Sequence, residues 1–159
     1  MKKQSITELL IFVVSAELIG TLSALISGNR FSQYSEFVKP PFSPPGALFP
    51  VIWTILYAIM GLSVYLIYSK TGNSAEKPKS YALYASQLAV NFLWSIVFFR
   101  FGCMGAAVGV LLVLITLITA MIIQFKKVSK TAAYLNLPYL IWVFFALYLN
   151  IATALLNRK

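Results

Sequence analysis

The side chains best suited to chemistry are three tryptophans and two asparagines that lie inside long apolar stretches at helical spacing. Asn91 and Trp94 are three residues apart, and Trp142 and Asn150 are eight apart, so each pair falls on one face of a helix. Polar and aromatic faces turn inward in a helix bundle surrounded by lipid. Together with Trp53, these faces predict an aromatic-walled pocket with amide groups, suited to a flat, mostly apolar ligand. Tight packing with hydrogen bonds between amides explains the same pattern.

Glu17 is the one ionisable side chain deep inside an apolar stretch. A charge is costly at that depth, and no Lys or Arg inside the apolar stretches offers a counter-charge, so we expect a protonated carboxyl that donates to Asn91, Asn150 or a backbone carbonyl. Such a group is either a structural hydrogen bond or a proton-coupling site. The second interpretation leads to an alternative function, a small proton-coupled exporter that uses Glu17.

The composition excludes several classes of site. The chain has no His, one Cys and four acidic residues, so it cannot assemble a zinc, iron or copper site from the usual imidazole and thiolate ligands, nor a Ser-His-Asp or Cys-His arrangement. We therefore expect no metal and no metal cofactor. The net charge of +9 comes from residues at the ends of apolar stretches, which indicates anionic lipid headgroups and not nucleic acid as the partner.

The apolar stretches themselves must position these side chains. The chain of 159 residues is 60% hydrophobic and 11% charged, with a mean hydropathy of +0.82, which is typical of a membrane protein. Because a helix needs about 20 residues to cross a bilayer, we predict one all-α domain over 1–159, a bundle of five transmembrane helices. Their expected ranges are 6–26, 47–68, 81–99, 105–125 and 132–156. Eight of the 13 Lys and Arg residues would share one face, so the positive-inside rule predicts a cytoplasmic N-terminus, in a bacterial cell membrane.

Each predicted helix carries a stripe of small, polar or aromatic residues that we expect to face the interior. The stripes are Glu17, Gly20, Thr21 and Ala24; Pro50, Trp53, Tyr57 and Gly61; Gln87, Asn91, Trp94 and Ser95; Gly105, Gly109, Leu112 and Thr116; and Tyr139, Trp142, Ala146, Asn150 and Thr153. Small residues four apart also allow helices from two subunits to approach closely. One such face is therefore expected to make a homodimer.

The connection over residues 27–46 holds four prolines between Lys39 and Gly46. Proline removes a backbone donor and pushes the preceding residue toward extended geometry, so this segment is a stiff, irregular strap. A strap of this length is either a lid over one mouth of the cavity or a rigid linker.

Three blocks of this sequence closely resemble the TspO/MBR family, which is also called the translocator, tryptophan-rich sensory or peripheral benzodiazepine receptor family. The first block is Lys39-Pro40-Pro41-Phe42-Ser43-Pro44-Pro45-Gly46, followed by Phe49-Pro50-x2-Trp53-x3-Tyr57. The other two are Gln87-Leu88-Ala89-x-Asn91-x2-Trp94-x3-Phe98-Phe99 and Leu137-Pro138-Tyr139-x2-Trp142-x2-Phe145-Ala146-x2-Leu149-Asn150. The blocks occur in order on three predicted helices, so the resemblance spans nearly the whole chain.

The resemblance implies a five-helix membrane protein, commonly a homodimer, whose cavity binds tetrapyrroles such as protoporphyrin IX and other flat apolar ligands. The ligand-binding residues that follow are Phe42, Phe49, Trp53, Tyr57, Asn91, Trp94, Trp142, Ala146 and Asn150. Haem usually requires an axial imidazole or thiolate, so the absence of His favours a metal-free porphyrin. The resemblance also implies light- and oxygen-dependent breakdown of the porphyrin. Indole is the most easily oxidised side chain available, which makes Trp53 and Trp142 the candidate catalytic residues.

Overall fold

The structure is a computed structural model that describes residues 5–28, 36–70 and 75–157, and all of its regular elements in these ranges are helical. The helices are α1 (Ile6–Ile26), α2 (Leu48–Ser69), α3 (Lys77–Ser95), a π-helical turn η2 (Ile96–Arg100), α4 (Met104–Val128), α5 (Lys130–Leu135) and α6 (Leu137–Leu156). Among the described residues, five helical columns are long and apolar enough to cross a membrane, with α3 and η2 forming one column and α5 and α6 another. The predicted all-α membrane fold with five spanning helices is thereby confirmed.

The helix ends follow local sequence signals. α1 has the bounds expected from the sequence, whereas the third column begins at Lys77 and not at residue 81. Pro78 lies in its first turn, where the missing backbone donor would have had no partner in any case. The fifth column begins at Lys130, because the Ser129 hydroxyl caps it by accepting a hydrogen bond from the Ala132 amide at 3.3 Å. Asn136 interrupts this column just before Pro138.

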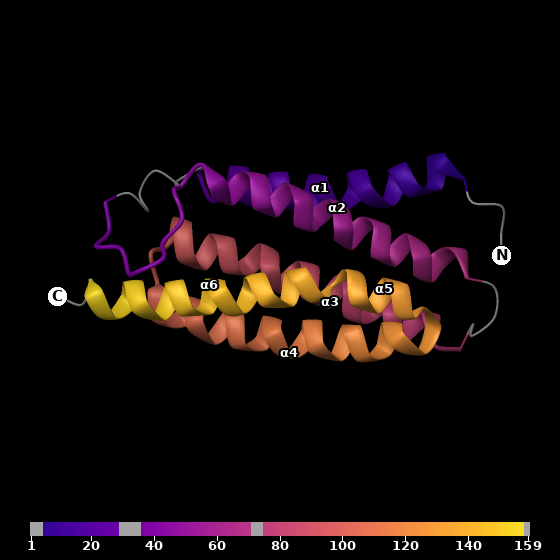
Figure 1. Cartoon of the computed structure of the whole chain (residues 1–159). Coiled ribbons are helices and arrows are strands. Elements are labelled where there is room, and N and C mark those ends of the chain that lie inside the picture. Colours follow the sequence, from indigo (N-terminus) through magenta and orange to yellow (C-terminus); the bar gives the residue numbers. More distant parts are fainter. Residues whose placement is uncertain (1–4, 29–35, 71–74, 158–159) are drawn as a thin grey trace.

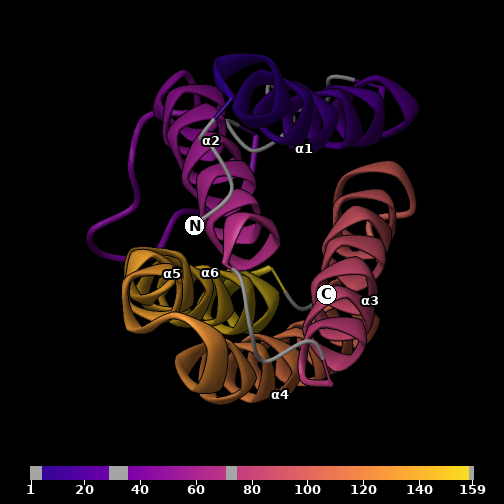
Figure 2. The same ribbon diagram turned by 90° about the vertical axis from the view of Figure 1, so that its right-hand side faces the viewer.

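The five columns lie lengthwise beside one another, and α1 begins at the end of the bundle opposite to the one where α6 ends (Figure 1). Viewed along the bundle, they form a ring in the order α1, α2, α5 with α6, α4 and α3 (Figure 2). α1 is the outermost element and fully buries only Ala16 and Ser23 along its length. Its main contact is with α2, where Gly61 lies against the backbone of Val13.

The predicted interior face of the fourth helix is wrong. Gly105, Gly109, Leu112 and Thr116 are exposed on the outside of the bundle. The buried face of α4 is instead apolar, with Ala107, Leu111, Leu114, Ile118, Met121 and Phe125 in the core. Thr116 needs no partner on another helix, because its hydroxyl donates to the Leu112 carbonyl at 3.0 Å. Large side chains fill the space between α3 and α6 better than glycine does, so packing volume decides the orientation of α4.

The described part of the proline-rich strap, residues 36–46, runs along the end of the bundle and is fastened to α6. Asn157 accepts a hydrogen bond from the Val38 amide and donates one to the Val38 carbonyl, both at 3.1 Å. The Tyr148 hydroxyl donates to the Pro41 carbonyl at 3.0 Å. Residues 29–35 of the expected lid lie outside the described residues.

Candidate ligand-binding site

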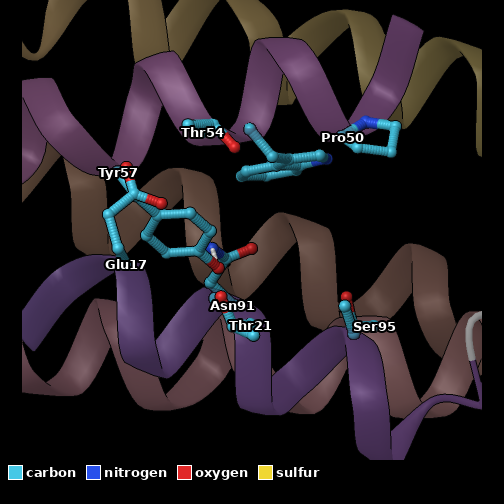
Figure 3. Close-up of a pocket in the computed structure, with 10 residues that line it drawn as sticks. Glu17, Thr21, Pro50, Thr54, Tyr57, Asn91 and Ser95 are labelled. Carbon is cyan, nitrogen blue, oxygen red and sulfur yellow. Dashed lines mark hydrogen bonds between the residues drawn. The ribbon is translucent and has the colours of Figure 1, made fainter. Parts of the chain in front are cut away.

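A cavity of about 170 Å³ lies between α1, α2 and α3 (Figure 3). Its walls are Glu17, Gly20, Thr21 and Ala24 of α1, Pro50, Trp53, Thr54 and Tyr57 of α2, and Asn91 and Ser95 of α3. Thr21, Pro50 and Thr54 are exposed, so the cavity opens on one side to the surface of the bundle. The sequence pattern had placed most of these residues on inward stripes. Thr54 is four residues after Pro50 and three before Tyr57, so it shares the face of the α2 stripe, although the predicted stripe does not include it.

A hydrogen bond between α2 and α3 fixes the inner end of this cavity. Asn91 donates from Nδ2 to the Tyr57 hydroxyl at 2.9 Å, and both side chains are buried. Tyr57 can reach this position because residue 20 is glycine, since a Cβ there would collide with the tyrosine ring. Figure 3 shows Tyr57, Glu17 and Asn91 toward one end of the cavity and Pro50 with Ser95 toward the other.

The indole of Trp53 connects this cavity to an aromatic cluster in the centre of the bundle. Its ring centroid lies 5.8 Å from that of Tyr57, 6.0 Å from that of Trp94 and 6.3 Å from that of Tyr139. Beyond Trp94 is a second, much smaller cavity of about 20 Å³, lined by Phe49, Trp94, Phe98, Phe99, Ala146, Leu149 and Asn150. The Trp53 and Trp94 rings therefore stand between the two cavities.

Asn150 of α6 links the helices that surround the second cavity. Its Oδ1 accepts a hydrogen bond from the Trp94 indole at 3.4 Å, and its Nδ2 donates to the Met104 carbonyl at 2.9 Å. This one amide thus joins α3, α4 and α6. Deeper in the bundle, the Tyr139 hydroxyl donates to Gln87 Oε1 at 2.8 Å and fixes α6 against α3.

The π-helical turn η2 supplies two residues that the predicted site lacked, Phe98 and Phe99. Their rings are 4.8 Å apart, and both contact Trp94, at 5.7 Å and 5.9 Å. A π-turn widens the helix locally, which allows two successive aromatic side chains to reach the same neighbour. Phe98 is four residues after Trp94 and continues the α3 stripe, whereas Phe99 does not lie on that stripe. Neither phenylalanine is among the predicted ligand-binding residues.

Two of the nine expected ligand-binding residues lie outside both cavities. Trp142 packs instead beside them, with its ring 5.9 Å from Phe49 and 5.4 Å from Phe145. Its buried indole nitrogen has no hydrogen-bond partner among the described residues. Phe42 is 87% exposed on the strap and adopts a left-handed backbone conformation with φ of 64°. The other seven line one cavity or the other: Phe49, Trp53, Tyr57, Asn91, Trp94, Ala146 and Asn150.

Glu17 lies on the wall of the larger cavity, near the middle of α1. Within the described part of the chain its carboxyl has no hydrogen bond: Asn91 donates to Tyr57 instead, and Asn150 belongs to the smaller cavity. The ten lining residues include one acid and no base. No three acidic or cysteine side chains of the described residues gather as a metal site. The groups available to a ligand are therefore aromatic faces, hydroxyls, an amide and one carboxyl.

These sequence blocks, with their positions around the two cavities, match a known family of membrane proteins. The sequence model of the TspO/MBR family matches residues 10–156. This chain belongs to the TspO/MBR family. The matched range contains every residue that lines the two cavities, so the site is part of the region shared with other TspO/MBR proteins.

Named relatives come from animals and bacteria. The translocator protein of Ovis aries is 40% identical over 126 residues, which cover 79% of this chain and 75% of that protein. The tryptophan-rich protein TspO of Chlorobaculum tepidum is 37% identical over 124 residues, 78% of each chain. The tryptophan-rich sensory protein of Cereibacter sphaeroides is 33% identical over 148 residues, 93% of this chain and 90% of that protein.

Proposed function

We propose that this TspO/MBR protein binds flat, predominantly apolar ligands between α1, α2 and α3, with tetrapyrroles, and metal-free protoporphyrin IX in particular, as the principal class. The observation that carries the proposal is the position of Trp53, whose indole lines the larger cavity while Tyr57 and Asn91 close its inner end. An indole face favours stacking with a planar ring system, and a small number of polar groups fixes its orientation.

A tetrapyrrole needs more room than the larger cavity offers. Ligand sites usually span about 300–1,000 Å³, whereas this cavity measures about 170 Å³. The smaller cavity lies just beyond the contact between Trp53 and Trp94. We expect a macrocycle to displace the Trp53 indole and to join the two cavities, and the open side toward the bundle surface gives further room.

Fluorescence titration of the purified protein with protoporphyrin IX tests this proposal. Saturable quenching of tryptophan is expected, because Trp53 and Trp94 lie at the site. Ala24→Phe fills the cavity wall and should abolish saturable quenching, whereas Ile123→Phe, on the exposed face of α4, should not. Non-saturable quenching in the wild type would remove the proposal.

Light-driven breakdown of the bound porphyrin is the enzymatic part of the proposal. Dioxygen is the oxidant: the light-excited macrocycle takes one electron from an indole and passes it to dioxygen. The indole radical then recovers an electron from the macrocycle, and the oxidised macrocycle combines with the superoxide formed. Both Trp53 and Trp142 remain candidates, and Trp53 ranks first because it lines the cavity. Trp53→Phe should keep porphyrin binding but lose the bleaching that exceeds the rate of free porphyrin, and Trp142→Phe should lose less. If the wild type shows no excess bleaching, the protein is a binder only.

A proton-coupled exporter is the second candidate function, and the position of Glu17 on the cavity wall favours it. An exporter of this kind should move a cationic dye out of proteoliposomes in response to a proton gradient. Glu17→Gln should abolish this transport. If the wild type transports no dye under these conditions, the second candidate fails and the binding proposal is unaffected.

We also propose in which membrane the protein lies, which way it is oriented and how it assembles. The described lysines at the α1 start of the bundle are Lys70, Lys77, Lys79, Lys126, Lys127 and Lys130, against Lys39 and Arg100 at the other end. The positive-inside rule then favours a cytoplasmic N-terminus, and we propose a bacterial cell membrane as the location. Exposed small residues on α3, such as Ala82 and Ala89, supply a face for a homodimer. Cysteine cross-linking from Ala82→Cys in membranes tests that face.

A further inference from the structure

The carboxyl of Glu17 has neither a hydrogen-bond donor nor a counter-ion among the described residues, although it lies on a cavity wall in the middle of a membrane span. Ionisable groups at that depth are costly and usually pair with another group. The nine other lining residues contain no Lys and no Arg. A partner for this carboxyl must therefore come from outside the described chain.

The polar atoms beside Glu17 point to the chemistry of that partner. Asn91 lines the cavity and uses its Nδ2 to donate to Tyr57, and no described residue donates a hydrogen bond to its Oδ1, so this oxygen can accept one from a ligand. The inner end of the cavity thus offers the carboxyl of Glu17 and the amide oxygen of Asn91, and no cationic donor. Figure 3 shows these two side chains near each other, with Tyr57. Acceptors without positive charge suit a ligand group that donates hydrogen bonds.

We propose that Glu17 makes this cavity selective for flat apolar ligands that carry a protonated nitrogen, and that the carboxylate pairs with this nitrogen at the inner end. This inference rests on the proposal that the cavity binds flat ligands. In a site that lipid and protein shield from water, a charge-assisted hydrogen bond is stronger than a neutral one, and the attraction between the two charges offsets part of the cost of burying them. The carboxylate groups of an anionic ligand would find no partner here and must remain at the mouth.

The size of the cavity agrees with a small aromatic cation. An apolar cavity of about 150 Å³ in another protein holds one benzene ring, and this cavity measures about 170 Å³. One or two rings of a ligand can therefore stack on Trp53 inside the cavity. The remainder of the ligand can extend through the side where Thr21 and Thr54 are exposed.

Two probes of nearly equal shape test the proposal. The protein is placed in nanodiscs of neutral phosphatidylcholine and titrated with 9-aminoacridine, which is a cation at neutral pH, and with acridone, which is uncharged. The wild type should bind the cation about tenfold more tightly, which corresponds to about 1.4 kcal/mol. Glu17→Gln should remove this preference and leave acridone binding unchanged, whereas Glu17→Asp, which keeps the charge, should retain a preference for the cation.

Glu8→Gln is the matched control, because Glu8 lies on α1 outside the cavity and accepts a hydrogen bond from Tyr68. This variant should retain the wild-type preference. The proposal is overturned if Glu17→Gln keeps the preference, if it weakens both probes equally, or if Glu8→Gln has the same effect. If neither probe binds to the wild type, the binding proposal for the cavity fails as well. Normal binding of acridone with no preference for the cation overturns only the role of Glu17.

Discussion

Asn91 on α3 and Tyr57 on α2 are joined by a hydrogen bond of 2.9 Å in which the asparagine amide donates to the phenol oxygen. Asn91 is 2% exposed and Tyr57 is 7% exposed, so neither group has water as a ready substitute. Gly20 on α1 makes room for the tyrosine ring. The inner end of the larger cavity is therefore formed by three helices: α2 and α3 are joined by this hydrogen bond, and α1 leaves space for the tyrosine ring at Gly20.

The first prediction concerns the strength of this bond. Tyr57→Phe removes the acceptor, and Asn91→Leu removes the donor with little change of volume. A hydrogen bond between membrane helices contributes about 0.6 kcal/mol on average and up to about 1.7 kcal/mol. A double-mutant cycle of thermal unfolding in detergent should give a coupling energy within this range. Strictly additive effects would show that the two side chains do not stabilise one another.

The second prediction compares a glycine that is closely packed against another helix with a glycine that has open space around it. A Cβ on Gly61 would lie 2.6 Å from Val13 Cα and 2.8 Å from the Phe12 carbonyl oxygen, both of which are backbone atoms of α1. Gly61→Ala should therefore separate α1 from α2 and destabilise the bundle by about 1–3 kcal/mol. A Cβ on Gly109 would meet nothing within 4 Å, so Gly109→Ala is the control and should leave stability equal or slightly higher. Equal melting temperatures for the two variants would contradict the observed packing.

The third prediction is a pH effect at the lysine-rich end of the bundle. Gln124 Nε2 donates to Glu76 Oε2 at 2.6 Å, and Lys127 Nζ lies 3.7 Å from the same oxygen. The hydrogen bond from Gln124, followed by the charge of Lys127, lowers the pKa of Glu76 below its ordinary value of 4.5. A lowered pKa in the folded state stabilises the protein above the ordinary value, and this contribution is lost as the pH falls through the lowered value.

Melting temperatures measured in detergent between pH 7 and pH 3 test this effect. Glu76→Gln should make the fall of the melting temperature toward low pH smaller, because the variant has no carboxyl to protonate at this position. Gln124→Ala should also make the fall of the melting temperature smaller, because it removes the larger cause of the lowered pKa of Glu76. An identical pH dependence in Glu76→Gln and wild type would show that the contacts of Glu76 contribute nothing to stability.

The helices were predictable from the sequence because lipid imposes a simple rule on them. Long apolar stretches can satisfy their backbone groups in a bilayer only as helices, so their number and approximate ends follow from the composition. The polar residues of α3 and α6 were placed correctly inside, since Gln87, Asn91 and Asn150 need partners that only neighbouring helices offer. Burial of amides in a membrane protein is therefore a strong sequence signal.

The site was less predictable at positions where side-chain packing, and not polarity, determines which residues line a cavity. Trp142 shares the polar stripe of α6, yet its ring packs beside Phe49 and lines neither cavity. The helical period predicts on which face of a helix a residue lies. It does not predict the rotamer of an aromatic side chain or how far its ring reaches into the bundle. Phe98 and Phe99 reach Trp94 through a π-turn, which changes the helical period locally. A regular α-helix would place Phe98 on the face of Trp94, four residues further on, but it would not place Phe99 there.

The last prediction concerns the strap, whose described part is held by two hydrogen bonds between Asn157 and the backbone of Val38 and by one from Tyr148 to Pro41. Glu36 is exposed just before this point, so a protease that cleaves after glutamate reports how often the strap leaves α6. Asn157→Ala removes the two bonds to Val38. Loss of about 1 kcal/mol should raise cleavage after Glu36 about fivefold, measured by the masses of the fragments. Thr116→Ala, on the outside of α4, is the control and should cleave like the wild type.

The same digestion distinguishes a lid from a linker. If the strap closes one mouth of the cavity, a bound ligand should hold it in place, so protoporphyrin IX should slow the cleavage after Glu36 in the wild type. The slowing should be weaker in Asn157→Ala, because ligand contacts would then have to replace the lost hydrogen bonds. Equal rates with and without porphyrin, under conditions where tryptophan quenching shows saturation, would make the strap a linker fixed to α6 and leave the open side of the cavity, near Thr21 and Thr54, as the route of entry.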